Sequence, residues 1–175
     1  MMAKGMLTRP SPSDFRFLWV LDFPLVELEE ADVPHGPTAA KLKSTHHPFT
    51  APHPEDLHRL EAEPLKVRGL HYDLVLNGVE LGGGSIRIHD VELQEKVLRT
   101  VLQLADEDIR AFSHLLEALG QGCPPHGGLA LGFDRLMAAM VGAETIRDVI
   151  AFPKSANGNE LLTGSPAAVD RGAYL

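Results

Sequence analysis

The sequence predicts an α+β fold. Residues 72–89 contain two apolar runs on either side of Asn77-Gly78. This dipeptide is the one most typical of a two-residue hairpin turn, because both turn positions require a positive φ. After the hairpin, apolar residues recur at helical spacing over residues 90–102 and 106–119. An antiparallel strand pair and two amphipathic helices together indicate the α+β class.

Composition places the chain of 175 residues among ordinary globular proteins, with 44% hydrophobic and 23% charged residues. Its single cysteine, Cys123, excludes an internal disulfide framework. The net charge is −8 and no dense basic cluster occurs, which argues against strong direct binding of nucleic acid by this chain alone. No apolar run approaches membrane-spanning length, and the nine histidines lack zinc-like spacing.

The elements before the hairpin are read from aromatic, proline and charge patterns. The aromatic run that ends before Pro24 predicts a buried strand, and the three prolines after His46-His47 exclude a helix there. The proline-rich loop suits either the rim of an active site or a rigid turn. The expected segments are a loose leader over 1–14, a buried strand over 15–23, a flexible connection over 27–45, a proline-pinned loop over 46–54 and a short helix over 55–63.

Two carboxylates on the hairpin form the first candidate site. Closing the turn sets Val75 opposite Glu80, so that Asp73 and Glu80 share one face of the strand pair. Neighbouring carboxylates repel each other unless a cation lies between them, and hard oxygen ligands suit Mg²⁺. An amphipathic hairpin with solvated charges explains the same pattern equally well.

The second strand of the hairpin has a phase problem. Glu80 and Arg87 are seven positions apart, so an unbroken strand would place them on opposite faces. The glycine triplet 82–84 between them predicts an irregularity that moves Ser85, Arg87 and His89 to the acidic face. Ile86 and Ile88 then point into the core.

Helices and one strand are expected after the hairpin. Asp90 is a good N-cap for the helix over 90–102, and Gly120 is the expected C′ residue of the helix over 106–119. The apolar stripes of these helices are interpreted as core. The remaining expectations are a small-residue strand that starts at Gly127, a helix that follows it, a turn with a final buried strand over 146–154, and a loose tail after 156.

The run Gly132-Phe133-Asp134-Arg135 lies between that strand and helix and forms the second candidate site. Asp134 is expected to cap the helix, with Leu136, Met137 and Met140 on its buried side. Arg135 then emerges from the first turn, where a planar guanidinium suits a phosphate or an adenine face. The alternative is a surface arginine paired with Asp134.

With these residues quoted, the chain resembles the C-terminal part of the catalytic domain of class II aminoacyl-tRNA synthetases, and more narrowly the aspartyl-tRNA synthetases of the bacterial and mitochondrial type. The resemblance covers nearly all of 15–163. It rests on six ordered runs, which are Leu21-Asp22-Phe23-Pro24-Leu25, His46-His47-Pro48-Phe49-Thr50, residues 72–89, Pro124-Pro125-His126-Gly127-Gly128, Gly132-Phe133-Asp134-Arg135 and residues 146–154.

The resemblance implies an antiparallel sheet flanked by helices that carries ATP and the amino acid on one face. Glu80 resembles the carboxylate that serves ATP and Mg²⁺, and Asp73 its partner on the metal. His46 and Arg87 resemble the residues that contact L-aspartate, with Arg87 on the side-chain carboxylate. Gly132, Phe133, Asp134 and Arg135 match the third class II motif, whose arginine covers the bent ATP.

The implied function is that of a ligase, which activates L-aspartate with ATP and transfers it to tRNA(Asp). The sequence lacks the first class II motif, through which such enzymes form homodimers, and the second motif with its phosphate-binding arginine. It also lacks an anticodon domain. We therefore expect a partial catalytic domain over 15–163, a linker remnant over 1–14 and a loose tail over 164–175, without competence as a synthetase on its own.

A second interpretation is a non-catalytic, synthetase-derived binding module or a degenerate paralogue. The intact Asp73, Glu80, Arg87 and Arg135 favour the ligase, and the missing motifs favour the module. The implied compartment is the mitochondrial matrix or the bacterial cytoplasm. The run Phe112-Ser113-His114-Leu115-Leu116 favours the mitochondrial form.

Overall fold

The structure of the chain is a computed structural model, which describes residues 11, 14–29 and 41–168. The described residues divide into two compact units, and each unit is described by itself. The larger unit covers 15–130, and the smaller one contains 131–168 with Ser11 and Asp14. The predicted division at 14/15 and 163/164 stays a prediction. No helix in the described ranges is long and apolar enough to cross a membrane.

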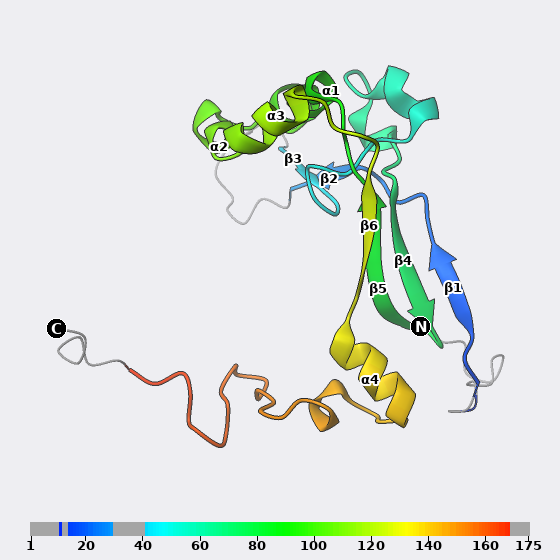
Figure 1. The fold of residues 1–175 in the computed structure, drawn as a ribbon, viewed down its shortest axis with the longest axis vertical. Coiled ribbons are helices and arrows are strands. Elements are labelled where there is room, and N and C mark those ends of the chain that lie inside the picture. The colour runs from blue at the N-terminus through cyan, green and yellow to red at the C-terminus, as the bar shows by residue number, and fades with distance from the viewer. Residues whose placement is uncertain (1–10, 12–13, 30–40, 169–175) are drawn as a thin grey trace. The chain divides into compact units, whose positions relative to one another are not determined.

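A four-stranded antiparallel sheet in the order β1-β4-β5-β6 forms the frame of the larger unit (Figure 1). A second sheet pairs two short strands in the stretch for which only a flexible connection was expected, so that expectation is wrong at both ends of the segment. Residues 30–40 of that segment lie outside the described ranges. The strands are β1 (Phe17–Val20), β2 (Val26–Leu28), β3 (Leu42–Ser44), β4 (His71–Leu76), β5 (Val79–Ile86) and β6 (Gly127–Leu131).

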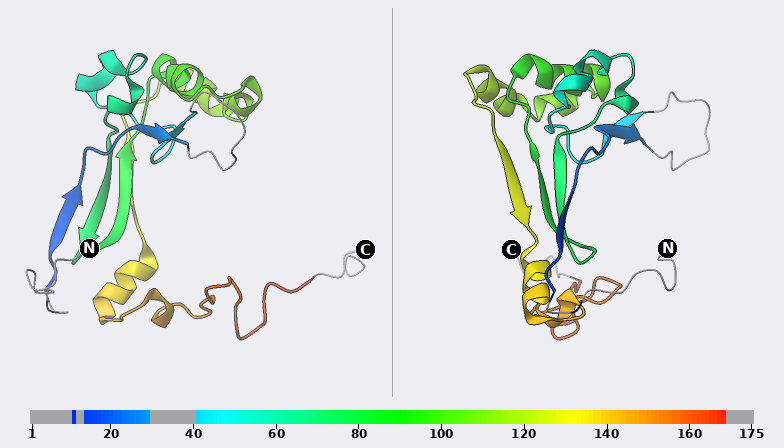
Figure 2. Two further views of the ribbon diagram at one scale, coloured as in Figure 1. Left: turned by 180° about the vertical axis from the view of Figure 1, so that it is seen from behind. Right: turned by 90° about the vertical axis from the view of Figure 1, so that its right-hand side faces the viewer.

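Short helices of the larger unit gather at one end of the sheet, as Figures 1 and 2 show from three sides. The helix expected over 106–119 is broken at Phe112 into two pieces, and Gly120 is the last residue of the second piece rather than its C′. The elements are the 3₁₀ helices η1 (Pro54–Arg59) and η2 (Pro64–Lys66), the helix α1 (Val91–Lys96), the π-helical turn η3 (Val97–Val101), α2 (Asp106–Arg110) and α3 (Ser113–Gly120).

The hairpin forms as the sequence predicts. Asn77 and Gly78 have φ values of 51° and 85°, and Val75 pairs with Glu80. The register then shifts, because Leu74 pairs with Gly82 and leaves Leu81 as the extra residue of a bulge. The predicted irregularity is confirmed, one residue before the glycine triplet.

Apolar side chains from β2, α1, η3 and the loops beside them form the core. Val67, Val97 and Leu98 have at most 1% of their surface exposed. Asp90 caps α1 by accepting the Leu93 N–H at 2.8 Å, as expected. Ile88 is buried as predicted, but Ile86, the last residue of β5, is 41% exposed, so its predicted burial is wrong.

The first strand departs from its predicted burial. A strand forms within 15–23, but Phe17 and Trp19 are 58% and 52% exposed. The reason is that β1 is an edge strand, which pairs only with β4, while the helices of this unit lie at the end of the sheet (Figure 2). The strand prediction is therefore confirmed and the burial prediction is wrong.

The smaller unit contains α4 (Phe133–Val141) and the 3₁₀ turn η4 (Ile146–Asp148). Gly132 is the N-cap of α4, so the expectation that Asp134 caps the helix is wrong, since the helix begins one residue before Asp134. Met140 is 64% exposed rather than buried. No strand forms over 146–154, where Phe152 is 57% exposed and only Lys154 makes an isolated bridge. The predicted final buried strand is wrong.

Candidate functional site

One face of the β4–β5 hairpin carries the predicted acidic residues. Asp73 pairs with Gly83 and Val75 pairs with Glu80, so Asp73 and Glu80 lie on the same side of the two strands. A Cβ atom placed on Gly83 would lie 2.5 Å from Asp73 Oδ1. The glycine therefore leaves room for the Asp73 carboxylate above β5.

The bulge at Leu81 brings the basic residue to the same side. Ser85 pairs with His71, which lies two residues before Asp73 and therefore on its face. Arg87 follows two residues later, immediately beyond β5, and its backbone N–H donates to the His126 carbonyl at 2.9 Å. His89, expected on the same face, lies further along the chain and is exposed.

The proline-pinned loop brings His47 to Arg87. Arg87 Nη1 lies 3.0 Å from His47 Nδ1, and the Phe49 backbone N–H donates to the same nitrogen at 3.2 Å. A guanidinium and an amide offer only donors, so His47 Nδ1 is an acceptor and the ring proton is on Nε2. This Nε2–H is directed at the Ser85 hydroxyl, whose oxygen lies 3.4 Å from Nε2. The contacts of one ring with Ser85 and Arg87 confirm that both share a face.

The environment of His47 favours its neutral form. The pKa of the imidazole is lowered from 6.5 to about 4, first because burial disfavours the charged form and then because Arg87 and His46 are close. Arg87 therefore faces an uncharged partner near neutral pH.

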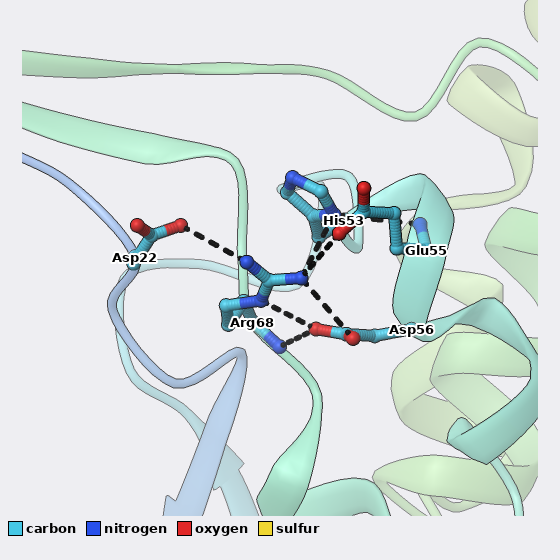
Figure 3. A network of polar contacts seen from close by, with 5 residues as sticks. All are labelled: Asp22, His53, Glu55, Asp56 and Arg68. Atoms are coloured by element: carbon cyan, nitrogen blue, oxygen red, sulfur yellow. Dashed lines mark hydrogen bonds and ion pairs between the residues drawn. The ribbon is translucent and has the colours of Figure 1, made fainter.

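Arg87, with its uncharged partner, differs from Arg68, another arginine of the larger unit that makes several polar contacts. Arg68 is surrounded by carboxylates, since its guanidinium lies 2.8 Å from Asp56 Oδ2, 3.0 Å from Glu55 and 3.6 Å from Asp22 (Figure 3). In the part of the chain that the structure describes, Arg87 makes no ion pair with a carboxylate. Arg68 thus has a structural role, whereas the charge of Arg87 is not compensated by a carboxylate among the described residues.

A column of stacked rings lies beside this pair. His71 stacks on Phe23 with a centroid distance of 4.7 Å and on His46 with a distance of 5.3 Å. His71 is buried, and neither of its ring nitrogens has a hydrogen-bond partner among the described residues. Burial, followed by the nearby His46, lowers its pKa, so the ring is held neutral. His46 is exposed and ends the column on the solvent side.

The second candidate site lies in the smaller unit. Gly132 precedes α4, and Phe133, Asp134 and Arg135 form its first turn, as the sequence predicts. Phe133 is 72% exposed, and Arg135 is exposed as well. The structure therefore brings Asp73, Glu80, His46 and Arg87 together in one unit, and the glycine-led turn belongs to the other.

Sequence reasoning did not identify His47, Ser85 and His71 as members of the site. His47 was named only as the second histidine of a pair, and Ser85 only by its phase in the strand. Their contacts join segments about forty residues apart, and no local pattern reports such pairing. The apolar neighbours of His71 were the one available signal, since they place its ring at the start of a buried strand.

Comparisons with known proteins identify relatives of the chain. The chain is 57% identical over 166 residues to the mitochondrial aspartate–tRNA ligase of Rattus norvegicus, a match that covers 95% of this chain and 24% of that ligase. It is 50% identical over 157 residues to the aspartate–tRNA(Asp/Asn) ligase of Opitutus terrae, covering 89% of this chain and 25% of that protein. The chain thus spans about a quarter of the length of the curated relatives that it matches.

A solved structure supports the fold. The aspartyl-tRNA synthetase of Entamoeba histolytica superposes with a TM-score of 0.53 over 81% of this chain and 23% of its own chain, at 23% identity. The part of that chain which superposes shares the α+β fold predicted from the sequence. The family model described as tRNA synthetases class II (D, K and N) matches residues 5–156, and the chain belongs to that family.

Proposed function

We propose that this chain carries part of the aspartate- and ATP-binding surface of an aspartate–tRNA ligase. The observation that carries the proposal is the charge of Arg87, which no described carboxylate pairs with, on the same face of the hairpin as Asp73 and Glu80. Identities of 57% and 50% to two ligases that act on aspartate support the choice of amino acid.

Arg87 has the properties of a carboxylate receptor. Its guanidinium is half-buried and oriented by His47, and none of the described carboxylates neutralises it. A planar guanidinium binds a carboxylate through two parallel hydrogen bonds. The amide of asparagine cannot accept both donors, so Arg87 would select aspartate against asparagine. His46, exposed at the end of the ring column, would contact the same substrate.

Asp73 and Glu80 suit a magnesium ion. Mg²⁺ is commonly bound by one or two protein carboxylates together with phosphate oxygens of the substrate. Among the described residues no group of three or more His, Cys, Asp or Glu is placed to hold a metal, so phosphate and water would complete the coordination. When bound, the ion would offset the negative charge of the ATP phosphates. Arg135 and the turn that begins at Gly132 would hold the nucleotide.

The reaction requires two anions to meet. An oxygen of the aspartate α-carboxylate attacks the α-phosphorus of ATP, a new C–O–P bond forms, and the bond to the β-phosphate oxygen breaks to release pyrophosphate. The enzyme contributes position and charge rather than covalent chemistry. Arg87 would position the amino acid by its side-chain carboxylate, and Arg135 would balance charge on the phosphates. Transfer to tRNA(Asp), in a homodimer, completes the function of the family.

The mitochondrial matrix is the compartment that we propose ahead of the bacterial cytoplasm. The identity to the mitochondrial ligase of Rattus norvegicus is 57%, and that to the bacterial ligase of Opitutus terrae is 50%.

Calorimetric titration tests the proposal. L-Aspartate is titrated into the chain and into Arg87→Ala, and ATP with Mg²⁺ into the chain and into Arg135→Ala. Matched controls remove one arginine from the same unit at an exposed position, Arg99→Ala for the first pair and Arg147→Ala for the second.

We expect saturable binding of both substrates, lost in Arg87→Ala for aspartate and weakened in Arg135→Ala for ATP, with both controls unchanged. Absence of either binding in a folded chain would contradict a surviving half-site. It would favour the second interpretation, a synthetase-derived module that does not bind these substrates. Equal binding of asparagine and aspartate would contradict the role of Arg87.

A further inference from the structure

His47 makes more polar contacts than any other histidine of the site. Its Nδ1 lies within hydrogen-bond distance of Arg87 Nη1 and of the Phe49 N–H, and its Nε2 lies 3.4 Å from Ser85 Oγ. Ser85 is 1% exposed, and Thr50, whose Oγ1 lies 3.4 Å from His47 Nδ1, is 2% exposed. The ring is thus held on the loop side by backbone and on the strand side by a buried hydroxyl.

This arrangement fixes one tautomer. Nδ1 has a single lone pair, and two obligate donors are directed at it. A proton on Nδ1 would face both the Phe49 N–H and the Arg87 guanidinium. The Nε2–H form leaves Nδ1 as an acceptor for these donors and directs the ring proton at Ser85 Oγ.

A neutral acceptor has a property that a carboxylate lacks. It orients a guanidinium through a hydrogen bond and leaves the positive charge available. Arg68 shows the opposite case within the same unit, because Asp56 and Glu55 orient its guanidinium and neutralise it together.

We propose that His47 is a positioning residue for substrate. As the neutral Nε2–H tautomer, it orients the Arg87 guanidinium through Nδ1 and preserves its full charge for the side-chain carboxylate of the amino acid. The inference deepens the proposed function and depends on it for the identity of the ligand. The Nδ1 to Nη1 hydrogen bond itself does not depend on that function.

His47→Asn and His47→Asp introduce side chains of nearly the same shape and differ in charge, so comparing them separates the position of the acceptor from its charge. Asparagine at residue 47 places a neutral acceptor near the position of Nδ1, and aspartate places a charged acceptor of the same size there. His47→Leu removes the acceptor. A residue with a purely structural role would tolerate Asn and Asp alike.

The measurement is the Kd for L-aspartate, obtained by calorimetry on the whole chain at pH 7.5. We expect His47→Asn to stay within about threefold of the parent chain, and both His47→Asp and His47→Leu to bind at least about tenfold more weakly. Asp and Asn variants of equal affinity would overturn the proposal. Circular dichroism and amide spectra verify that each variant is folded before titration.

Nitrogen-detected NMR of the imidazole rings gives a second reading that needs no ligand. We expect His47 in the parent chain to show the Nε2–H pattern, with Nδ1 unprotonated. An Nδ1–H or doubly protonated ring at pH 7.5 would overturn the proposal. If the parent chain shows the Nε2–H ring but binds no aspartate, then the proposed function fails and, with no substrate to position, His47 has no such role, while its hydrogen bond to Arg87 stands.

Discussion

Asp56 and Arg68 are joined by three contacts to one carboxylate. Asp56 Oδ2 accepts the Arg68 backbone N–H at 3.1 Å and its Nε–H at 2.8 Å, and Oδ1 lies 3.3 Å from Nη2 (Figure 3). Asp56 is 6% exposed, so its carboxylate is shielded from water. The pair fastens the 3₁₀ helix η1 to the segment that leads into β4.

Replacement of Asp56 by alanine is therefore expected to destabilise the larger unit. The substitution leaves the Arg68 N–H and guanidinium without their main acceptor. We expect the midpoint of thermal unfolding at pH 7 to fall by several degrees, as measured by circular dichroism. Glu55→Ala is the control, since Glu55 is 76% exposed and makes a single contact with Arg68 through Nη2, so its midpoint should change little. Equal effects of the two changes would contradict the role given to Asp56.

The stabilisation of the folded state by Asp56 should be lost in acid over a defined pH range. Hydrogen bonds from Arg68 lower the pKa of Asp56 from 3.8 to about 2. A carboxylate with a lowered pKa stabilises the folded state above its unfolded pKa and loses that contribution as pH falls through its folded value. The difference in unfolding midpoint between the parent chain and Asp56→Ala should be complete at pH 5 and shrink between about pH 4 and pH 2. A difference that persists unchanged at pH 2 would show that charge is not its source.

His71 gives a prediction of the opposite kind. Its ring is buried and both nitrogens lack a partner in the described structure, so it carries an unsatisfied polar group inside the ring column. Phenylalanine keeps the stacking on Phe23 and His46 and removes the polar atoms. We expect His71→Phe to unfold at the same or a higher urea concentration than the parent chain at pH 7. A loss as large as that of His71→Ala would indicate that the nitrogens are needed.

His71→Phe should also change how the stability of the chain depends on pH. The pKa of His71 is lowered, and that of His47 is lowered to about 4. Histidines with lowered pKa values contribute stability above their unfolded value of about 6.5, and that contribution declines as pH falls, for His47 down to about 4. Denaturant titrations at intervals from pH 7.5 to pH 4 should show a shallower decline for His71→Phe than for the parent chain. Parallel curves would contradict the assignment of part of the decline to His71.

Gly84 is the position where β5 can least accept a side chain. A Cβ atom there would overlap the carbonyl oxygen of Gly128, the same oxygen to which the Tyr72 hydroxyl donates at 2.9 Å. Since the obstacle is backbone, no rotamer relieves it, and Gly84→Ala must displace β6. We expect strongly increased amide hydrogen exchange in β6 and a lower unfolding midpoint. Gly128→Ala is the matched control, because a Cβ there meets nothing within 4 Å. Intact β6 protection in Gly84→Ala would contradict this close approach.

The N-cap of α1 is the simplest element to test. Asp90 accepts the Leu93 N–H at 2.8 Å, and loss of such a cap costs about 1 kcal/mol. Asp90→Ala should lower the free energy of unfolding by that amount in urea, whereas Glu92→Ala, on the exposed side of the same turn, should leave it nearly unchanged. A larger effect for Glu92 would place the helix start elsewhere.

The parts that the sequence predicts well are those encoded within a few residues. Asn77-Gly78 specifies its own turn, and Asp90 its own cap. The odd spacing of Glu80 and Arg87 predicts the bulge, because strand alternation leaves no other way to align them. The helix after Gly132 follows in the same way from a local signal.

The parts that the sequence predicts badly depend on which distant segments pack against each other. The aromatic run in β1 reads as buried, yet hydrophobicity does not tell which element covers a strand. The predicted burial of Phe152 is wrong for the same reason. The contact between His47 and Arg87 spans forty residues and was not foreseen, although both residues had been named. Pattern and resemblance were enough to name candidate residues, but not to predict the contacts between them.

The extra residue at Leu81 makes the length of β5 part of its chemistry. Deleting Leu81 would restore simple alternation with Glu80 and Arg87 six positions apart, so both would stay on one face. Adding one residue to the strand while the bulge remains would carry Arg87 to the far side of the sheet, away from the acids. Every side chain would remain present in the lengthened chain, and the proposed receptor would still be dismantled. Substitutions in this stretch are therefore expected to be graded in effect, whereas a single added residue changes the face on which Arg87 lies, and loss of the bulge residue can absorb a single deletion.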